Sequence, residues 1–166
     1  TPLLVVDRVM IAKSADRLLD DDALGALKAE LIRRAFVVTP NIPEAETLTG
    51  LRIETEADRR EAARRLVALG AWAAMVKGGH LPSATMVDLL FDGREFREFE
   101  HERVARDNTH GTGCTFAAAI AAHLALGRSL ADAIPRAQSY IAGAIRNGPA
   151  LGKGHGPMHH FWELFR

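Results

Sequence analysis

The stretch Thr109-His110-Gly111-Thr112-Gly113-Cys114-Thr115, followed by the run FAAAIAAHLALG that ends at Gly127, decides how the rest of the sequence is interpreted. Two glycines separated by one residue precede a run rich in alanine and leucine, which predicts a helix beginning at the glycines. The first turn of a helix carries free backbone N–H groups and partial positive charge, so this junction suits a phosphate or a developing anion. Cys114 falls in that first turn, where a thiol is acidified.

Length and composition indicate one globular domain over residues 1–166. The chain is 48% hydrophobic and 25% charged, which is typical of a folded protein and not of a disordered one. Lys+Arg and Asp+Glu are equal at 21 each, so charge gives no argument for a nucleic-acid or membrane partner. The single cysteine excludes an internal disulfide and fits a reducing compartment, and we expect a cytoplasmic protein.

Short apolar runs alternate with helical patterns along the first half of the chain. Strands are predicted at 3–7, 35–39 and 71–77, and helices at about 20–32, 42–50 and 55–69. This alternation predicts an α/β protein with a mostly parallel sheet covered by helices on both faces. A hairpin with a two-residue Asp92-Gly93 turn is expected within 85–100, then a short extended piece at 102–106. Further helices are expected at 112–127, 130–147 and 159–166.

Polar residues directly follow the three predicted parallel strands, namely Asp7, residues 39–44 and residues 77–80. Ligands bind at the carboxyl ends of strands in such sheets. Asp7 fits a Mg²⁺ ligand and an ordinary loop hydrogen bond equally well. Asn41 and Glu44 have the spacing of a capping box, which is compatible with Glu44 facing a phosphate and Mg²⁺.

Other features leave alternatives open. Lys77 stands before Gly78 and Gly79, whose lack of side chains permits close backbone approach to a phosphate. Cys114 fits either a reactive group or a small buried residue, and a lone Gly-x-Gly is weak evidence that lacks the Walker A ending. His155, His159 and His160 match no usual zinc spacing.

Taken together, these segments resemble the hydroxymethylpyrimidine/phosphomethylpyrimidine kinases of thiamine biosynthesis, in the ribokinase-like superfamily. The similar segments are spread in order along the chain: 6–10 with 12–14, 39–45, 76–80, 88–93, 108–115 and 152–157. The resemblance implies a three-layer α/β/α fold. It also implies ATP- and Mg²⁺-dependent phosphorylation of 4-amino-5-hydroxymethyl-2-methylpyrimidine and then of its monophosphate.

The resemblance also assigns expected roles to single residues. It implies a metal site, a nucleotide and phosphate site, a pyrimidine contact and a phosphoryl anion hole with Cys114 as base. The metal site would comprise Asp7, Glu44 and Asn41, and the nucleotide and phosphate site would comprise Lys77, Gly78, Gly79, Thr109 and Lys153. Val9 would contact the pyrimidine. The anion hole would be formed by Gly111, Thr112 and Gly113, beside Cys114. The expected partners are small-molecule substrates and further copies of the chain, without nucleic acid or membrane.

Two departures from the family pattern modify these expectations. Arg8 stands where the family has proline after the strand-end aspartate, and the family's N-terminal part, with its Gly-rich substrate loop, is absent from this sequence. We therefore expect the 166-residue chain by itself to bind the pyrimidine weakly and to turn over slowly. The alternatives are a pyridoxal kinase of the same superfamily and a truncated, non-catalytic nucleotide-binding protein.

Overall fold

The computed structural model describes residues 3–7, 21–78, 85–106, 108–149, 151, 154 and 156–165. By their internal contacts the residues fall into two compact units, Thr1–Glu100 and His101–Arg166.

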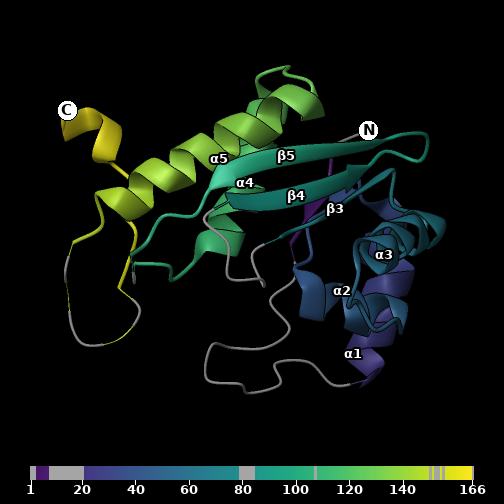
Figure 1. Ribbon diagram of the computed structural model, residues 1–166. Helices are drawn as coiled ribbons and strands as arrows, with labels where there is room; N and C mark the ends of the chain where they lie inside the picture. The colour runs from purple at the N-terminus through teal and green to yellow at the C-terminus, as the bar shows by residue number, and fades with distance from the viewer. Residues whose placement is uncertain are drawn as a thin grey trace. The chain divides into compact units, whose positions relative to one another are not determined.

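A mixed five-stranded sheet organises the first unit (Figure 1). Its strands are β1 (Val5–Val6), β2 (Val37–Val38), β3 (Ala73–Val76), β4 (Thr85–Phe91) and β5 (Phe96–Glu102), in the order β1-β2-β3-β4-β5. The first three strands are parallel, as predicted, whereas β4 pairs antiparallel with β3. The expectation of a mostly parallel sheet therefore holds for β1 to β3, and the hairpin makes the whole sheet mixed.

The helices of this unit begin and end close to where the sequence predicts. They are α1 (Asp21–Ala26), α2 (Ile42–Thr49) and α3 (Glu56–Ala68). Asn41 with Glu44 and Thr55 with Asp58 form complete capping boxes, and Gly50 ends α2 with a φ of 69°. The helix expected at 20–32 is less regular, because α1 continues as a π-helical turn over Leu27–Leu31 and a 3-10 turn over Ile32–Arg34.

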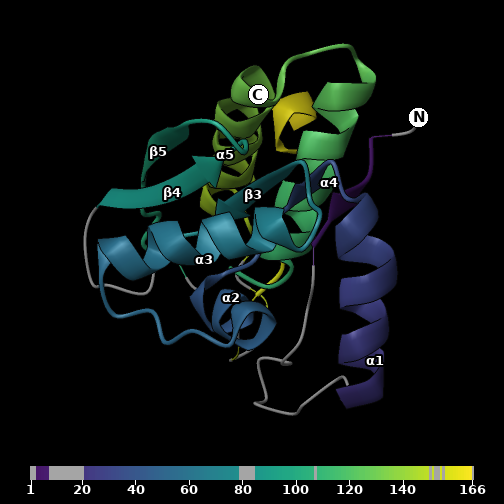
Figure 2. The ribbon, with the colours of Figure 1, turned by 90° about the vertical axis from the view of Figure 1, so that its right-hand side faces the viewer.

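The core of the first unit lies between the strands and the helices. Figure 2 shows α3 running along the sheet beside β3 and β4, with α2 next to α3. Buried apolar side chains from β2, β3, α2 and α3 join in one cluster, among them Val38, Leu48, Leu66 and Val76, and the partly buried Phe91 of β4 packs against it. Removing such side chains from water is the main force that holds the helices on the sheet.

The hairpin differs from its prediction at the turn. Four residues, 92–95, connect β4 to β5 where two were expected. The Asp92 carboxylate accepts the backbone N–H groups of Glu95 at 2.9 Å and Arg94 at 3.0 Å. These bonds, led by the one from Glu95, lower the pKa of Asp92. The extended piece expected at 102–106 is also wrong beyond Glu102, where β5 ends.

The second unit is built on two packed helices, α4 (Thr112–Ala125) and α5 (Leu130–Arg146). Both agree with the predicted ranges, and Ser129 caps α5 by accepting the N–H of Asp132 at 3.2 Å. The predicted terminal helix is a short 3-10 turn, Trp162–Phe165. Trp162 packs so closely on α5 that a Cβ added to Gly143 would lie 2.2 Å from its ring. In the described part of the chain, no helix combines the length and hydropathy that crossing a bilayer requires.

Candidate functional site

Three side chains converge where the parallel strands of the first unit end. Asp7 follows β1, Thr39 follows β2 and Lys77 follows β3. The Asp7 Oδ1 atom accepts hydrogen bonds from the Thr39 hydroxyl at 3.1 Å and from the Lys77 ammonium at 3.2 Å. The side chains of Asp7 and Lys77 are only 11% and 17% exposed, and Thr39 is fully buried. The predicted strand-end residues Asp7 and Lys77 are thus brought into contact.

Both donors use the same oxygen of Asp7. In the described part of the chain, the other carboxylate oxygen, Oδ2, receives no hydrogen bond. A buried carboxylate with one oxygen fixed by two donors has a defined orientation and one oxygen available to a ligand. This geometry suits a cation or a water bound to a cation, and it also makes Lys77 the counter-ion of Asp7.

Asn41 and Glu44 at the start of α2 use part of their polar atoms in the cap. The Glu44 N–H donates to Asn41 Oδ1 at 2.9 Å, and the Asn41 N–H donates to Glu44 Oε2 at 2.8 Å. The capping interpretation of this pair is therefore confirmed. The carbonyl oxygen of Asn41, its one side-chain atom able to ligate a cation, is engaged in the cap, and its amide NH₂ is a donor suited to an anion.

The donor set of this edge limits the kind of metal site it can form. Within the described residues, no three His, Cys, Asp or Glu side chains come together to hold an ion by themselves. Mg²⁺ commonly uses one or two carboxylates and completes its shell with waters and substrate phosphates. Asp7 and Glu44 fit that arrangement and do not fit an all-protein cage.

The backbone after β3 is held on both sides of Lys77. The Lys77 N–H donates to the Pro40 carbonyl at 2.8 Å, and the Gly78 N–H donates to Asp88 Oδ1 at 2.7 Å. A Cβ on Gly78 would lie 2.2 Å from the Val87 carbonyl oxygen. The close approach that requires Gly78 is therefore to strand β4. Sequence reasoning missed Asp88, although a carboxylate within the apolar run MVDLLF is a visible signal.

In the second unit, the start of α4 has the predicted form. Gly111 is the N-cap residue with a φ of 80°, and the Thr112 hydroxyl donates to the Thr109 carbonyl at 2.7 Å. The Gly113 N–H donates to no group in the part of the chain that the structure describes. Cys114 is exposed, so its interpretation as a buried filler is wrong. The helix start therefore offers backbone donors next to an accessible thiol.

Asn108, just before this helix start, fixes the segment that follows α5. Its side-chain amide donates to the carbonyls of Pro149 at 2.8 Å and Pro157 at 3.1 Å, and the residue is only 8% exposed. A Cβ on Gly148 or Gly156 would approach Asn108 to 2.8 Å or 2.6 Å. The sequence showed Asn108 only as a polar lead-in. Val9, Gly79, Lys153 and His155, named from the sequence, lie outside the described residues.

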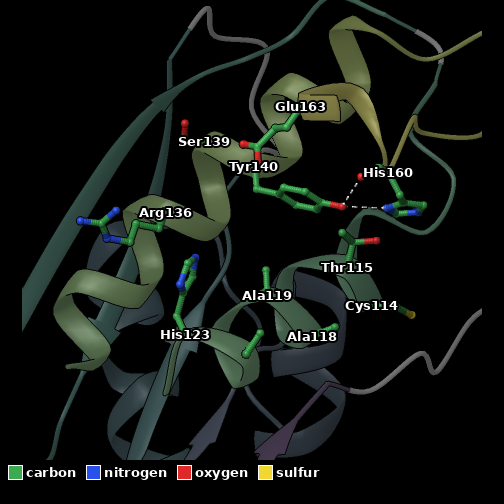
Figure 3. Close-up of a pocket in the computed structure, with 11 residues that line it drawn as sticks. Cys114, Thr115, Ala118, Ala119, His123, Arg136, Ser139, Tyr140, His160 and Glu163 are labelled. Carbon is green, nitrogen blue, oxygen red and sulfur yellow. Dashed lines mark hydrogen bonds between the residues drawn. The ribbon is translucent and has the colours of Figure 1, made fainter. Parts of the chain in front are cut away.

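A pocket of about 720 Å³ lies within the second unit, between α4, α5 and the C-terminal turn (Figure 3). Alanines and His123 of α4 line the pocket together with polar groups of α5, including Arg136 and Tyr140. The Tyr140 hydroxyl donates to the His160 carbonyl at 2.9 Å. His159 and His160 belong to no metal-ligating group among the described residues.

His123 in this pocket gives a prediction about pH. Its Nδ1 is buried and makes no hydrogen bond in the described part of the chain. Burial, and then the charges of Arg128 and Arg136, lower the pKa of His123 below its usual 6.5. The unfolded chain takes up this proton first, so the stability that neutral His123 contributes is complete above pH 6.5. It is lost as the pH falls through the lower folded pKa.

We therefore expect the melting temperature of the parent to fall more steeply than that of His123→Gln when the pH is lowered from 7 to 5. Thermal unfolding followed by circular dichroism across this range measures the difference. The difference in melting temperature between the two proteins at pH 8, where both are neutral at this position, is the baseline for comparison at lower pH. Parallel pH profiles would show that His123 does not contribute.

Comparisons with known proteins show which family and fold the chain resembles. A family model described as Phosphomethylpyrimidine kinase matches residues 1–159. A thiamine biosynthesis bifunctional protein of Geobacter sulfurreducens is 54% identical over 95% of this chain, and the chain covers 32% of that protein. A hydroxymethylpyrimidine/phosphomethylpyrimidine kinase of Bacillus subtilis is 46% identical over 95% of this chain.

Solved structures match over nearly the whole chain. The crystal structure of an ADP complex of Bacillus subtilis pyridoxal kinase is 37% identical to the chain, with a TM-score of 0.86 over 98% of its residues. The present chain covers 61% of that structure and 59% of the Bacillus subtilis hydroxymethylpyrimidine/phosphomethylpyrimidine kinase. The 166 residues thus have the ribokinase-like kinase fold over about three-fifths of the length of these relatives.

Proposed function

Since the chain belongs to the phosphomethylpyrimidine kinase family, we propose that it carries out ATP-dependent phosphorylation of 4-amino-5-hydroxymethyl-2-methylpyrimidine and of its monophosphate, in thiamine biosynthesis. The observation that carries the proposal is the buried contact of Asp7, Thr39 and Lys77 at the carboxyl edge of the parallel strands. A carboxylate and an ammonium in contact at such an edge are the groups that phosphoryl transfer requires to bind a metal–phosphate substrate.

The proposal assigns Asp7 and Glu44 to Mg²⁺. The ion would neutralise charge on the nucleotide phosphates, which is the contribution that phosphoryl transfer needs from it. Asp7 offers the oxygen that is not used by Thr39 and Lys77. Asn41, named from the sequence with the metal ligands, offers its amide NH₂ and is better suited to a phosphate oxygen.

The proposal assigns Lys77 to the nucleotide phosphates. Its ammonium has Asp7 as counter-ion, and a nucleotide bound with Mg²⁺ would supply both an anion for Lys77 and a cation for Asp7. The exchange keeps both buried charges compensated, which a buried ion pair requires. Gly78 supports this position through its backbone, while Gly79, Thr109 and Lys153 remain predicted nucleotide contacts.

The start of α4 is assigned to the transferred phosphoryl group and the acceptor. The backbone amides of Gly111 to Gly113 would stabilise negative charge at a helix N-terminus. The Cys114 thiolate would accept the proton of the hydroxymethyl group as its oxygen attacks the terminal phosphorus of ATP. Val9 remains a predicted contact of the pyrimidine.

A second candidate function is phosphorylation of pyridoxal. It is favoured by the similarity to solved structures named as pyridoxal kinases, at 36% and 37% identity. The hydroxymethylpyrimidine/phosphomethylpyrimidine kinase of Bacillus subtilis is more similar in sequence, at 46% identity. We therefore propose the pyrimidine as the acceptor ahead of pyridoxal.

The decisive experiment measures ADP release by the purified chain with Mg²⁺, ATP and each acceptor in turn: the hydroxymethylpyrimidine, its monophosphate and pyridoxal. We expect slow turnover that is fastest with the pyrimidines. ATP binding in calorimetry without ADP release would instead support a non-catalytic nucleotide-binding protein. Sedimentation at several concentrations tests the proposed self-association.

A further inference from the structure

Asp88 on β4 lies against the backbone that carries Lys77. The antiparallel register pairs Val76 with Leu89, so the next residue, Lys77, faces Asp88, and Gly78 faces Val87. Asp88 is 5% exposed, and its Oδ1 accepts the Gly78 N–H at 2.7 Å. A side-chain carboxylate thus binds the backbone just where β3 ends.

The space around Gly78 is a second, independent sign of this attachment. A Cβ at this position would lie 2.2 Å from the carbonyl oxygen of Val87 and 2.9 Å from its carbonyl carbon. Only glycine lets the backbone come so close to β4. The amide is then within hydrogen-bonding distance of Asp88.

These contacts restrict where the Lys77 side chain can go. The N–H of Lys77 donates to Pro40 at 2.8 Å, and the next N–H donates to Asp88. With the backbone fixed on both sides, the Lys77 ammonium reaches Asp7 at 3.2 Å. Burying a carboxylate at a strand position costs desolvation free energy that an apolar residue at the same position would not cost.

We propose that Asp88 is a positioning residue: by holding the Gly78 amide it aims the Lys77 ammonium at the site of the nucleotide phosphates. This inference rests on the proposed function, which gives Lys77 its phosphate partner. Asp88 itself is assigned no contact with the nucleotide. Its effect on nucleotide binding should therefore disappear when Lys77 is absent.

A double-mutant cycle on ATP affinity tests this dependence. In the otherwise unchanged chain, Asp88→Ala should weaken ATP binding by about tenfold, the size of one well-made charge-assisted hydrogen bond. In a Lys77→Met background, Asp88→Ala should weaken it by less than about twofold, because the group it positions has been removed. An equal loss in both backgrounds would overturn the proposal, since Asp88 would then act on the fold in general.

Asp92 provides a matched control at the far end of the same strand. Its carboxylate also accepts two backbone N–H groups, but those lie in the hairpin loop. Asp92→Ala should lower the melting temperature and leave ATP affinity unchanged; a tenfold loss of affinity in Asp92→Ala as well would count against a specific role for Asp88. Asp88→Val, which has no acceptor for the Gly78 amide and packs an apolar side chain on the strand, replaces Asp88→Ala in the cycle if the alanine variant does not fold.

A second readout does not depend on nucleotide. The Asp7–Lys77 contact should make the melting-temperature losses of Asp7→Asn and Lys77→Met non-additive in the parent. Those losses should become additive once Asp88 is alanine, because Lys77 no longer reaches Asp7. If the parent fails to bind ATP, the proposed function is wrong, and this unfolding cycle alone decides whether Asp88 positions Lys77; unchanged non-additivity would overturn the inference.

Discussion

Replacing Gly78 with alanine is expected to lower the free energy of unfolding by about 3 kcal/mol, through the overpacking of a rigid site and the loss of a charge-assisted hydrogen bond. The added Cβ would meet backbone atoms of Val87, the nearest at 2.2 Å. A strand backbone cannot move aside as the end of a flexible side chain can. The strands must therefore separate at this point, which removes the Gly78–Asp88 hydrogen bond and displaces Lys77.

Thermal unfolding checks this expectation, with a fall in melting temperature of about 10 °C for a chain of this size. Gly25→Ala is the matched control, because a Cβ at that position in α1 would have nothing within 4 Å. Alanine also has the higher helix propensity, so the control should be neutral or slightly stabilising. A Gly78→Ala protein that melts within two or three degrees (roughly 1 kcal/mol) of the parent would contradict the tight packing of β3 on β4.

Cys114→Ala is expected to slow phosphorylation of the hydroxymethyl group by about 10²- to 10⁴-fold, the usual contribution of a positioned general base. The alcohol must lose a proton as it attacks, and Cys114 is an exposed thiol in the first turn of α4. The monophosphate already carries a nucleophilic oxygen without a proton, so its phosphorylation needs little base. We expect that second rate to fall by less than about tenfold.

Single-turnover measurements with each acceptor, using protein in excess over ATP, compare the two steps even when turnover is slow. Because the chain has only one cysteine, alkylation with iodoacetamide is a direct control. It should slow the first step of the parent and leave the Cys114→Ala protein unchanged. Equal losses in both steps would show that the thiol supports the helix start and does not act as a base.

The strongest local signals in the sequence predicted the fold well. Two capping boxes are visible in the sequence as a capping residue followed three positions later by an acidic one, Asn41 with Glu44 and Thr55 with Asp58. Helices α2 and α3 begin where these pairs predict. The hairpin was predicted but its turn was not. Asp92-Gly93 suggested two residues, whereas the Asp92 side chain stabilises a connection of four by binding the amides two and three residues later.

For the candidate site, the sequence predicted the meeting of two strand-end residues but not the contacts that support them. Asp7 and Lys77 were expected at one edge because the ends of parallel strands lie together, and they are in contact there. Thr39 and Asp88 were not assigned to this site as partners. Which atom Thr39 reaches depends on the register of β1 and β2, and Asp88 faces Lys77 only because β4 runs antiparallel. Because β2 and β3 are buried on both faces, their unbroken apolar runs show that the residues are buried but not which residues of neighbouring strands pair.

The contact between Asp7 and Lys77 also bears on the order in which the chain assembles. It joins residues 70 positions apart, and β2, whose Thr39 binds the same oxygen, lies between their strands in the sheet. Closing so long a loop is costly in entropy until the intervening strand is in place. We therefore expect the ion pair to form late in folding, so that Lys77→Met should speed unfolding more than it slows refolding in stopped-flow measurements.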